Sequence, residues 1–218
     1  MNQWNEDDAQ FMFKAADELA SEVSKSFAAE IMSDNNSFSK RLMRSVNPGH
    51  SLTPTIKQQC ISLINANLGE HYEKSFGHDW QHDKNQEMED PGLVYLFYRE
   101  QDIDGQLGEV VIFLSFMVTY NEGEKVLYLY EIHLHPLYQG MGIGSFLLDN
   151  FHQLSASLSG QLKTSATSLT VFSANERAFK WYKSTGYELT QQSPQDRKLR
   201  GKIVKPECYW LRRSNNNA

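Results

Sequence analysis

The sequence predicts an α/β (α+β) fold, in which helices flank a mixed, mostly antiparallel sheet and a further helix extends the N-terminus. Apolar residues recur with the helical period in several segments, and runs rich in Val, Ile, Phe and Tyr lie between them. Three of these runs follow one another across short turns, which favours antiparallel pairing. The 218 residues, 40% of them hydrophobic, are enough for a sizeable core.

The N-terminal segment is expected to form a long amphipathic helix. Its apolar residues follow steps of three and four, at Met12, Ala16, Leu19, Val23, Phe27 and Ile31. Residues 33–51 contain Asn-Pro-Gly and few apolar anchors, so we expect a mobile linker there. The predicted organisation is an N-terminal helix and linker over residues 1–52, a main domain over 53–213 and a disordered tail over 214–218.

A second helix is expected to begin after Thr53. This residue is a good N-cap, and Pro54 suits the first helical position. The apolar helical spacing continues to Leu68, and Gly69 offers a stop. Residues 71–80 are aromatic, polar and aperiodic, which predicts an ordered surface loop of the kind that often forms a substrate wall.

The central part of the chain predicts a meander of three strands. These are expected over residues 93–99, 109–120 and 126–134. The pairs Asp104-Gly105 and Glu122-Gly123 mark the turns between them. A glycine-rich loop comes next, followed by a helix over 146–154, a strand over 168–172, a helix over 178–182 and closing strands over 187–189 and 207–211.

Charge and composition limit the classes of function. A net charge of −6 argues against a general nucleic-acid surface, which is normally basic. It is compatible with a cationic substrate steered into an acidic cleft, or with solubility alone. No apolar run approaches the roughly 18 residues that cross a bilayer, and the N-terminus lacks the pattern of a secretory signal. We therefore expect a soluble intracellular protein with no direct nucleic-acid or membrane partner.

The two cysteines, Cys60 and Cys208, are interpreted as ordinary thiols. They are too few for a disulfide framework, and neither belongs to a Cys-x-x-Cys pair. No Cys/His cluster has zinc-ligand spacing, so no metal is expected.

A glycine-rich run, Gln139-Gly140-Met141-Gly142-Ile143-Gly144, lies between a predicted strand and a predicted helix. The first turn of a helix presents N–H groups and partial positive charge to an anion, and glycine permits close approach. A dinucleotide-binding loop would place its third glycine one position later, and a Walker loop would end in Gly-Lys-Ser/Thr. The run therefore indicates another kind of phosphate loop, or a turn that only caps the helix.

Two motifs in this order carry a resemblance to a known superfamily. Gln139-x-x-Gly142-x-Gly144 resembles the acetyl-CoA signature of the GNAT superfamily of N-acetyltransferases, which is Gln/Arg-x-x-Gly-x-Gly/Ala. The stretch from Asn175 through Ala178 and Tyr182 to Gly186-Tyr187 resembles its second block. The resemblance covers residues 93–189. It implies the GNAT fold, in which two central strands splay apart and acetyl-CoA lies in the gap.

The resemblance also implies a set of cofactor-binding residues. The pantetheine arm would pair with backbone groups of one strand, the pyrophosphate would bind the glycine-rich loop, and one asparagine would orient the cofactor. In that order the residues are Ile132, His133 and Leu134; Gln139, Gly140, Met141, Gly142, Ile143, Gly144 and Ser145; and Asn175.

Acetyl transfer to an amine needs a group that accepts a proton and benefits from one that donates a proton. Tyr182 lies where many members of the superfamily place the acid, although it could simply pack against CoA. Glu131 could accept the amine's proton directly or through water, although it could equally pair with a surface cation. Glu122 is a further candidate. Strand alternation places His133 on the face of Glu131, but a structural role is the simpler interpretation of His133 and His135.

Features outside these motifs resemble the NatD family of N-alpha-acetyltransferases over residues 53–212. They are Leu127-Tyr-Leu-Tyr-Glu-Ile132, Ser168-Leu-Thr-Val-Phe172, Tyr72-Glu73-x-Ser75 with Trp80, and Cys208-Tyr209. NatD enzymes acetylate the free α-amino group of histone 4 and histone 2A, which begin Ser-Gly-Arg-Gly. The implied peptide-binding residues are Tyr72, Trp80, Tyr130, Thr170, Ser193 and Tyr209.

This resemblance implies further properties. The N-terminal tails of histone 4 and histone 2A would be the partners, and the protein would lie in the nucleus and cytoplasm. Neither motif block contains a cysteine, which favours direct transfer in a ternary complex over a covalent intermediate. We expect a monomer.

One departure from the NatD pattern concerns acidic residues. In the family an Asp-x-Glu pair precedes the Tyr-x-Tyr-Glu strand and engages the substrate's arginine and amine. Here Thr119 and Asn121 occupy the corresponding positions. Glu122 and Glu124 lie just beyond them and could substitute through a shifted turn. The departure leaves open which acid binds the arginine and strengthens Glu131 as the candidate base.

Two rival functions stay open at this stage. The first is an acetyltransferase for a small amine or a lysine side chain, because fold alone does not select a substrate. The second is a catalytically silent CoA-binding module that recruits partners, with the N-terminal helix as its interaction surface.

Overall fold

The computed structural model describes residues 6–35 and 38–215, and the side chains of residues 15–32 and 40–215. The chain forms two compact units. The first comprises residues 1–117 and 131–154, and the second comprises residues 118–130 and 155–218. Strands β4 (Leu107–Asn121) and β5 (Glu124–Leu134) and helix α4 (Ile143–Ser157) each continue from one unit into the other.

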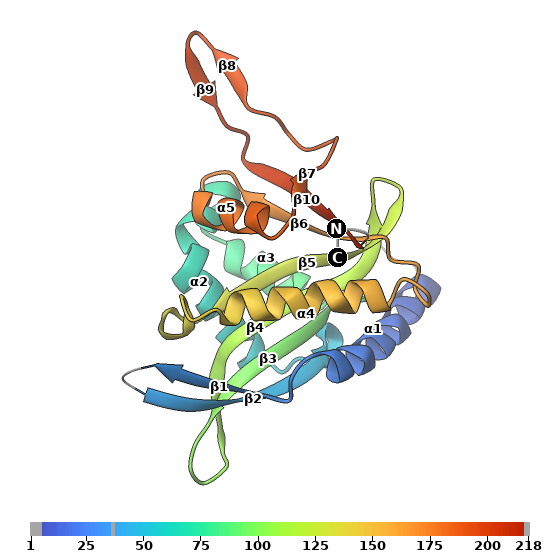
Figure 1. Ribbon diagram of the computed structural model, residues 1–218, viewed down its shortest axis with the longest axis vertical. Coiled ribbons are helices and arrows are strands. Elements are labelled where there is room, and N and C mark those ends of the chain that lie inside the picture. The colour runs from blue at the N-terminus through green and yellow to red at the C-terminus, as the bar shows by residue number, and fades with distance from the viewer. Residues whose placement is uncertain (1–5, 36–37, 216–218) are drawn as a thin grey trace. The chain divides into compact units, whose positions relative to one another are not determined.

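The first unit contains an antiparallel sheet. Strands β1, β2, β3, β4 and β5 neighbour one another in that order (Figure 1). The other elements of this unit are α1 (Glu6–Ser26), β1 (Glu30–Asn35), β2 (Phe38–Pro48), η1 (Gly49–Ser51), α2 (Pro54–Phe76), α3 (Trp80–Glu87), β3 (Val94–Gln101) and η2 (Pro136–Tyr138). β3 is central, because it pairs with β2 on one side and with β4 on the other.

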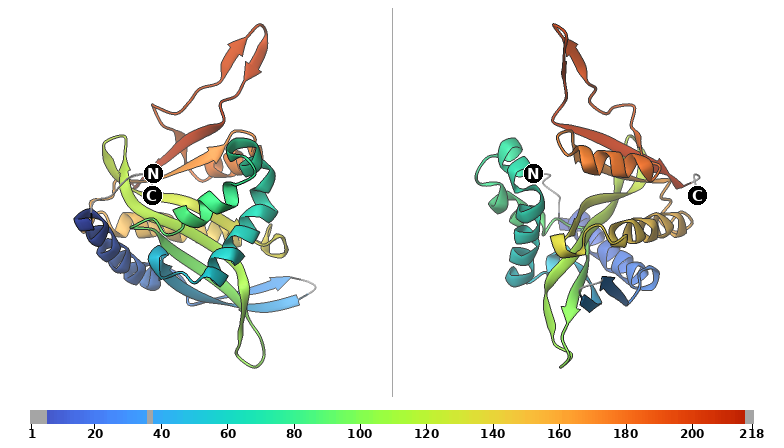
Figure 2. Two further views of the ribbon diagram at one scale, coloured as in Figure 1. Left: turned by 180° about the vertical axis from the view of Figure 1, so that it is seen from behind. Right: turned by 60° about the vertical axis from the view of Figure 1, so that its left-hand side comes forward.

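Helices cover both faces of this sheet. α2 and α3 lie on one face, and α1 and α4 lie on the other, as the two views of Figure 2 show. Side chains of β3 pack against the helices on both faces of the sheet, because successive side chains of a strand point to opposite faces. Tyr95 and Phe97 belong to the core cluster beneath α2 and α3. On α1, the predicted apolar residues Ala16, Leu19 and Val23 are buried. Phe27 is buried just after the helix ends, and the prediction that the helix includes Ile31 is wrong, because Ile31 belongs to β1.

The predicted mobile linker over residues 33–51 is wrong for its described part. Residues 38–48 form β2, which pairs with β3 from Arg41–Gln101 to Pro48–Val94. β1 pairs with β2 in turn. The sequence gives little sign of this strand because Leu42 is its main buried apolar side chain. Backbone pairing with β3, rather than a strong apolar pattern, places it in the sheet.

The predicted helix stop at Gly69 and the loop over residues 71–80 are also wrong. Thr53 caps α2 by accepting a hydrogen bond from the Ile56 amide, as predicted, but the helix continues to Phe76. It ends at Gly77, whose φ of 84° only glycine adopts readily. A Cβ built at Gly69 would lie 2.6 Å from the Asn65 side chain, so Gly69 serves close packing within the helix. α3 then begins at Trp80.

The second unit contains the parallel part of the sheet. β5 pairs in parallel with β6 from Val126–Ala166 to Leu129–Leu169, and β6 pairs antiparallel with β10, which pairs with β7. The elements are β6 (Ala166–Phe172), α5 (Glu176–Ser184), β7 (Glu188–Leu189), β8 (Arg197–Leu199), β9 (Lys202–Val204) and β10 (Cys208–Ser214). The prediction of a mixed, mostly antiparallel sheet is therefore confirmed.

Two further differences concern the C-terminal region. The sequence analysis missed the β8–β9 hairpin, whose residues are exposed and carry little apolar pattern. The predicted disordered tail over residues 214–218 is wrong at its start, because Ser214 belongs to β10. Asn215 donates from its side-chain amide to the carbonyls of Ser155 and Thr164. Residues 216–218 lie outside the described part.

In the described part of the chain, no helix combines the length and the apolar character needed to span a membrane.

Candidate active site

The glycine-rich loop connects η2 to α4 within the first unit. Gly140 and Gly142 have φ values of 75° and 80°, and a Cβ built at either meets nothing within 4 Å. The first hydrogen bond of the helix runs from the Phe146 amide to the Gly142 carbonyl. The amides of Ile143 and Gly144 precede it, at the positive end of a 15-residue helix. Open space, glycine backbone and a helix N-terminus together fit a phosphate group.

Asn67 of α2 holds the strand that leads into this loop. Its amide donates to the Leu134 carbonyl at 3.0 Å and contacts Nδ1 of His133 at 3.3 Å. Gln139 donates to the same carbonyl at 2.9 Å and to Asn67 Oδ1 at 3.1 Å. These two bonds fill both lone pairs of the Leu134 carbonyl. They anchor the loop and leave a cofactor to pair with other backbone groups of the strand. No local pattern in the sequence predicted this role of Asn67.

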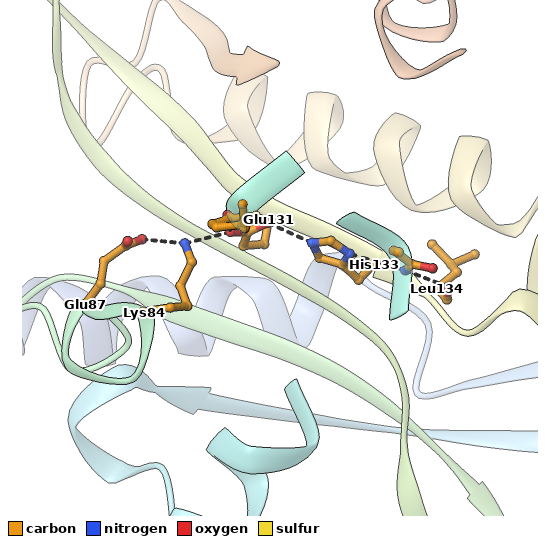
Figure 3. Close-up of polar contacts among 7 residues, drawn as sticks. Lys84, Glu87, Glu131, His133 and Leu134 are labelled. Carbon is orange, nitrogen blue, oxygen red and sulfur yellow. Dashed lines mark hydrogen bonds and ion pairs between the residues drawn. The ribbon is translucent and has the colours of Figure 1, made fainter. Parts of the chain in front are cut away.

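A buried charge cluster lies on β5, α2 and α3 of the first unit. It consists of Tyr72, Lys84, Glu131 and His133. Glu131 is 8% exposed, and its Oε1 accepts from Lys84 Nζ at 2.7 Å and from the Tyr72 hydroxyl. Its Oε2 lies 2.7 Å from Nε2 of His133. Figure 3 shows Lys84 between Glu87 and Glu131, with His133 on the far side of Glu131.

The cluster fixes the charge states of Glu131, Lys84 and Tyr72. Burial alone would raise the pKa of Glu131, but the Lys84 ammonium and the hydrogen bond from His133 outweigh it and hold the pKa well below its usual range. Burial would lower the pKa of Lys84, but Glu131 raises it well above its usual value. Burial and Glu131 both raise the pKa of Tyr72. The result is a buried ion pair beside a neutral phenol.

This geometry bears on the predicted role of Glu131. Both carboxylate oxygens have partners, and a carboxylate with a depressed pKa has little tendency to take up a proton near neutral pH. The arrangement favours a positioning role, in which Glu131 orients Tyr72 and His133. Lys84, the partner that sets this charge balance, was not predicted from the sequence.

Tyr72 and Trp80, two of the predicted peptide-binding residues, lie together in the first unit. Their ring centroids are 4.7 Å apart, and Lys84 Nζ lies 5.3 Å from the Tyr72 centroid. Trp80 is buried in the core, whereas Tyr72 is half-buried. Trp80 thus packs in the core, and the predicted contacts of Trp80 and Tyr72 with a peptide stay predictions.

The second unit contains a shallow hollow of about 270 Å³. Seven residues line it: Thr119, Tyr120, Asn121, Tyr128, Tyr130, Thr170 and Trp210. Tyr128 and Tyr130 meet edge to face at 5.0 Å, and the hydroxyls of Tyr128 and Thr170 share a hydrogen bond of 2.6 Å. The β5–β6 ladder runs only to Leu129 and Leu169, just before Tyr130 and Thr170. The hollow thus includes two predicted peptide-binding residues.

Ser193 and Tyr209, also predicted to bind the peptide, have structural partners within the second unit. The Ser193 hydroxyl accepts from the Trp210 amide at 3.0 Å. The Tyr209 hydroxyl donates to Asp196, and burial together with that carboxylate raises the pKa of Tyr209 to about 12. Ser193 therefore supports the backbone at Trp210, Tyr209 is held by the Asp196 side chain, and neither residue is among those that line the hollow.

The residues of the second motif block run from the N-cap of α5 to just after its end. Asn175 caps the helix by accepting a hydrogen bond from the Ala178 amide at 3.1 Å. Tyr182 is buried, with its ring centroid 4.9 Å from that of Trp181 and 5.7 Å from that of Tyr187. The cap gives Asn175 a structural reason to be present, while its predicted contact with the cofactor stays a prediction.

The two acidic residues after Asn121 are engaged within the second unit. Glu122 has a φ of 50° in the β4–β5 turn and accepts from the Gln192 amide at 3.1 Å. Glu124 forms an ion pair with Arg212 and accepts from the Ser165 hydroxyl at 2.6 Å. Neither lines the hollow. The predicted roles of Glu122 and Glu124 toward a substrate stay predictions.

Both cysteines are free thiols, as predicted. Burial raises the pKa of Cys60, and burial likewise raises that of Cys208. A thiol with a raised pKa is a poor nucleophile near neutral pH. In residues 6–35 and 38–215, no three His, Cys, Asp or Glu side chains gather into a group that could hold a metal ion.

A family model matches the sequence of this chain, and solved structures match its fold. The model of the acetyltransferase (GNAT) family matches residues 61–187, more than half of the chain. The chain therefore belongs to the GNAT acetyltransferase family, and the predicted GNAT fold is confirmed.

Individual relatives extend the comparison. N-alpha-acetyltransferase 40 of Saccharomyces cerevisiae is 32% identical over 157 residues, which are 62% of this chain and 52% of that protein. The chain thus spans about half the length of this curated relative. Arabidopsis thaliana NAA60 in complex with acetyl-CoA is 15% identical, with a TM-score of 0.51, over 80% of this chain and 99% of that one. PaiA N-acetyltransferase from Thermoplasma acidophilum in complex with coenzyme A is 12% identical, with a TM-score of 0.51, over 78% and 98%. At these identities the two structures show the fold.

Proposed function

We propose that this protein is an acetyl-CoA-dependent N-alpha-acetyltransferase, which moves an acetyl group to the free N-terminal amine of a peptide. The observation that carries the proposal is the open glycine loop at the N-terminus of α4, because it fits a pyrophosphate and lies where the GNAT signature expects it. The matched yeast N-alpha-acetyltransferase 40 supports a peptide α-amine as the acceptor.

In this proposal the amides of the loop around Gly142 and Gly144 hold the pyrophosphate, and backbone groups of Ile132 and His133 pair with the pantetheine arm. When bound, acetyl-CoA supplies the acetyl thioester and the thiol that departs. Asn67 and Gln139 act indirectly by fixing the strand before the loop.

The peptide's α-amine needs modest help to react. Its ordinary pKa is about 7.7–8.0, so an appreciable fraction is neutral near pH 7. We assign Tyr182 as the residue that holds a proton for the departing sulfur. We assign Glu131 as a positioning residue that keeps the Tyr72 hydroxyl directed at its own carboxylate, so that the phenol oxygen can accept a hydrogen bond from the amine. The proton that the nitrogen loses as the C–N bond forms passes to water, and water returns a proton to Tyr182 after the thiol departs.

The finer proposal concerns the substrate. We propose that the acceptors are the N-terminal tails of histone 4 and histone 2A, which begin Ser-Gly-Arg-Gly. The relation to N-alpha-acetyltransferase 40 and the tyrosines of the hollow support it. Tyrosine hydroxyls both donate and accept, so they can bond a peptide backbone beside a small first residue.

The test is acetylation of short peptides, monitored by mass spectrometry. A Ser-Gly-Arg-Gly peptide with a free N-terminus should gain one acetyl group, and the same peptide with a blocked N-terminus should gain none. Equal turnover of the two would exclude the N-terminal assignment and favour a lysine side chain or a small amine. A panel that varies the first four residues would then define the histone preference.

A catalytically silent CoA-binding module is the second candidate. Gly142→Val should weaken CoA binding by at least tenfold, because the side chain would occupy the loop's open space at a φ of 80°. Calorimetry with CoA measures this independently of turnover. If the unmodified protein binds CoA but acetylates no peptide, the module interpretation holds.

Two further variants test the roles assigned to Tyr182 and Glu131. Tyr182→Phe should lower kcat by roughly a hundredfold with little change in CoA affinity, as expected for loss of a general acid. Glu131→Gln should lower kcat/KM by disturbing Tyr72. Unchanged acetylation by both variants, with CoA still bound, would contradict both assignments.

Location and assembly follow from the same proposal. A histone substrate implies a protein in the nucleus and cytoplasm, which imaging of a tagged chain would test. We propose a monomer, and sedimentation at several concentrations would reveal any self-association.

A further inference from the structure

The hollow of the second unit is lined without any ionisable acid or base other than tyrosine. Thr119, Asn121 and Thr170 contribute hydroxyl and amide groups, and aromatic rings make up the remaining wall. Tyr130 and Trp210 are each 37% exposed, so part of each side chain meets solvent. The lining can exchange hydrogen bonds in both directions, because amides and hydroxyls donate and accept.

The nearest acidic residues along β4 and β5 are committed elsewhere. The Glu124 carboxylate meets the guanidinium of Arg212 and the hydroxyl of Ser165. Glu122 accepts from the Gln192 amide. If either carboxylate bound a substrate cation instead, the second unit would lose an interaction that this carboxylate makes. Neither of these two carboxylates is therefore a ready counter-ion for the hollow.

A positive charge lies at the margin of the hollow. Lys125 Nζ lies 5.7 Å from the ring centroid of Tyr120, one of the lining residues. This ammonium occupies one face of the ring and would repel a second cation placed near it. A guanidinium carries five N–H donors and no acceptor, so it gains most from a carboxylate partner. An uncharged amide or hydroxyl suits this lining better.

We propose that the hollow receives an uncharged polar side chain from the first four residues of the acetylated peptide, and that it gives arginine no advantage. The inference rests on the proposed N-alpha-acetyltransferase function and narrows its substrate class. Histone tails can still react, but recognition then depends on their small first residues rather than on the arginine.

The test compares kcat/KM for the peptides Ser-Gly-Arg-Gly and Ser-Gly-Gln-Gly, with identical sequences beyond. For the unmodified protein we expect the glutamine peptide to react at least as well as the arginine peptide. Thr119→Asp together with Asn121→Glu should raise the ratio of arginine to glutamine turnover by about tenfold or more, since it adds carboxylates to the lining.

A matched control removes the effect of side-chain size. Thr119→Asn together with Asn121→Gln has nearly the same shape as the acidic pair but no charge, and it should leave the ratio within about twofold of the unmodified protein. A comparable change in this control would show that shape rather than charge sets the ratio, and would overturn the inference.

Two other outcomes also test the inference about the hollow. A tenfold or larger preference of the unmodified protein for the arginine peptide would overturn this inference and leave the proposed function intact. If neither peptide nor any peptide of the panel is acetylated while CoA still binds, the proposed function fails and this inference fails with it. Folding of each variant is checked by its thermal transition.

Discussion

In the first unit, Lys84 and Glu131 are buried against each other with Tyr72 and His133, whereas the hollow of the second unit is lined by no Asp, Glu, Lys or Arg. Tyr130 and Glu131 are consecutive residues of β5, yet one lines the hollow and the other belongs to the buried charge cluster. The charges of this cluster therefore serve the internal order of the first unit. The surface offered by the hollow relies instead on hydroxyls, amides and rings.

The largest expected effect comes from breaking the buried ion pair. Lys84→Met leaves the Glu131 carboxylate buried without its main cation, which typically costs about 3–5 kcal/mol of stability. Denaturant unfolding measures this cost.

Lys57→Met is the matched control. Lys57 is also buried, but its partner Glu89 is 59% exposed and can be solvated once the pair is lost. We expect a clearly smaller cost, of about 1 kcal/mol. Equal losses of unfolding free energy in the two variants would mean that burial of both partners does not make the Lys84–Glu131 pair more important for stability.

The pH dependence of stability gives the next largest effect. The pKa of Glu131 is depressed in the folded state, so its contribution is complete above the unfolded value, about 4.3, and is lost as pH falls toward the folded value. The stability difference between the unmodified protein and Glu131→Gln should be constant from pH 7 to about 5 and shrink below about 4. Urea unfolding at several pH values measures it. A difference that already falls between pH 7 and 5 would show that Glu131 titrates near neutrality, as a base would.

A substitution in the hollow should separate recognition from stability. Trp210→Ala should lower kcat/KM for the peptide by about tenfold, because it removes an aromatic wall. The partly exposed side chain should contribute only about 1 kcal/mol to unfolding. Steady-state kinetics together with thermal unfolding tests both parts. Unchanged kinetics would place the peptide elsewhere.

The smallest expected effect concerns the cation at the margin of the hollow. Lys125→Gln should raise kcat/KM for the arginine peptide about twofold, in line with the weak coupling of exposed charges. The glutamine peptide should be unaffected. Added salt should reduce the difference, because it screens exposed charges.

The sequence predicted the elements that have strong local signals. The turn at Glu122-Gly123 and the end of α5 at Gly186 depend on backbone angles that glycine supplies, and both are present. β2 was missed because its place comes from backbone pairing with β3, which leaves little trace in residue type. The continuation of α2 past Gly69 was missed because a glycine weakens a helix without ending it.

The candidate site was predicted unevenly for a related reason. The glycine loop is a local motif, so its place before α4 followed from the sequence. Lys84 lies in a polar stretch with Asp and Gln neighbours, where a lysine normally faces solvent. Asn67 acts on a carbonyl 67 positions along the chain. Both roles depend on tertiary contacts that no local pattern reports.

The buried pair of Lys84 and Glu131 has a consequence for how this chain can diverge. Removing either charge alone strands the other in the interior, whereas replacing both with apolar residues of similar volume is often tolerated. Related chains should therefore show co-variation between the two positions, with both charged or both apolar. A single natural replacement at one of them would be accompanied by a new cation or a repacked neighbour at the same point of the core.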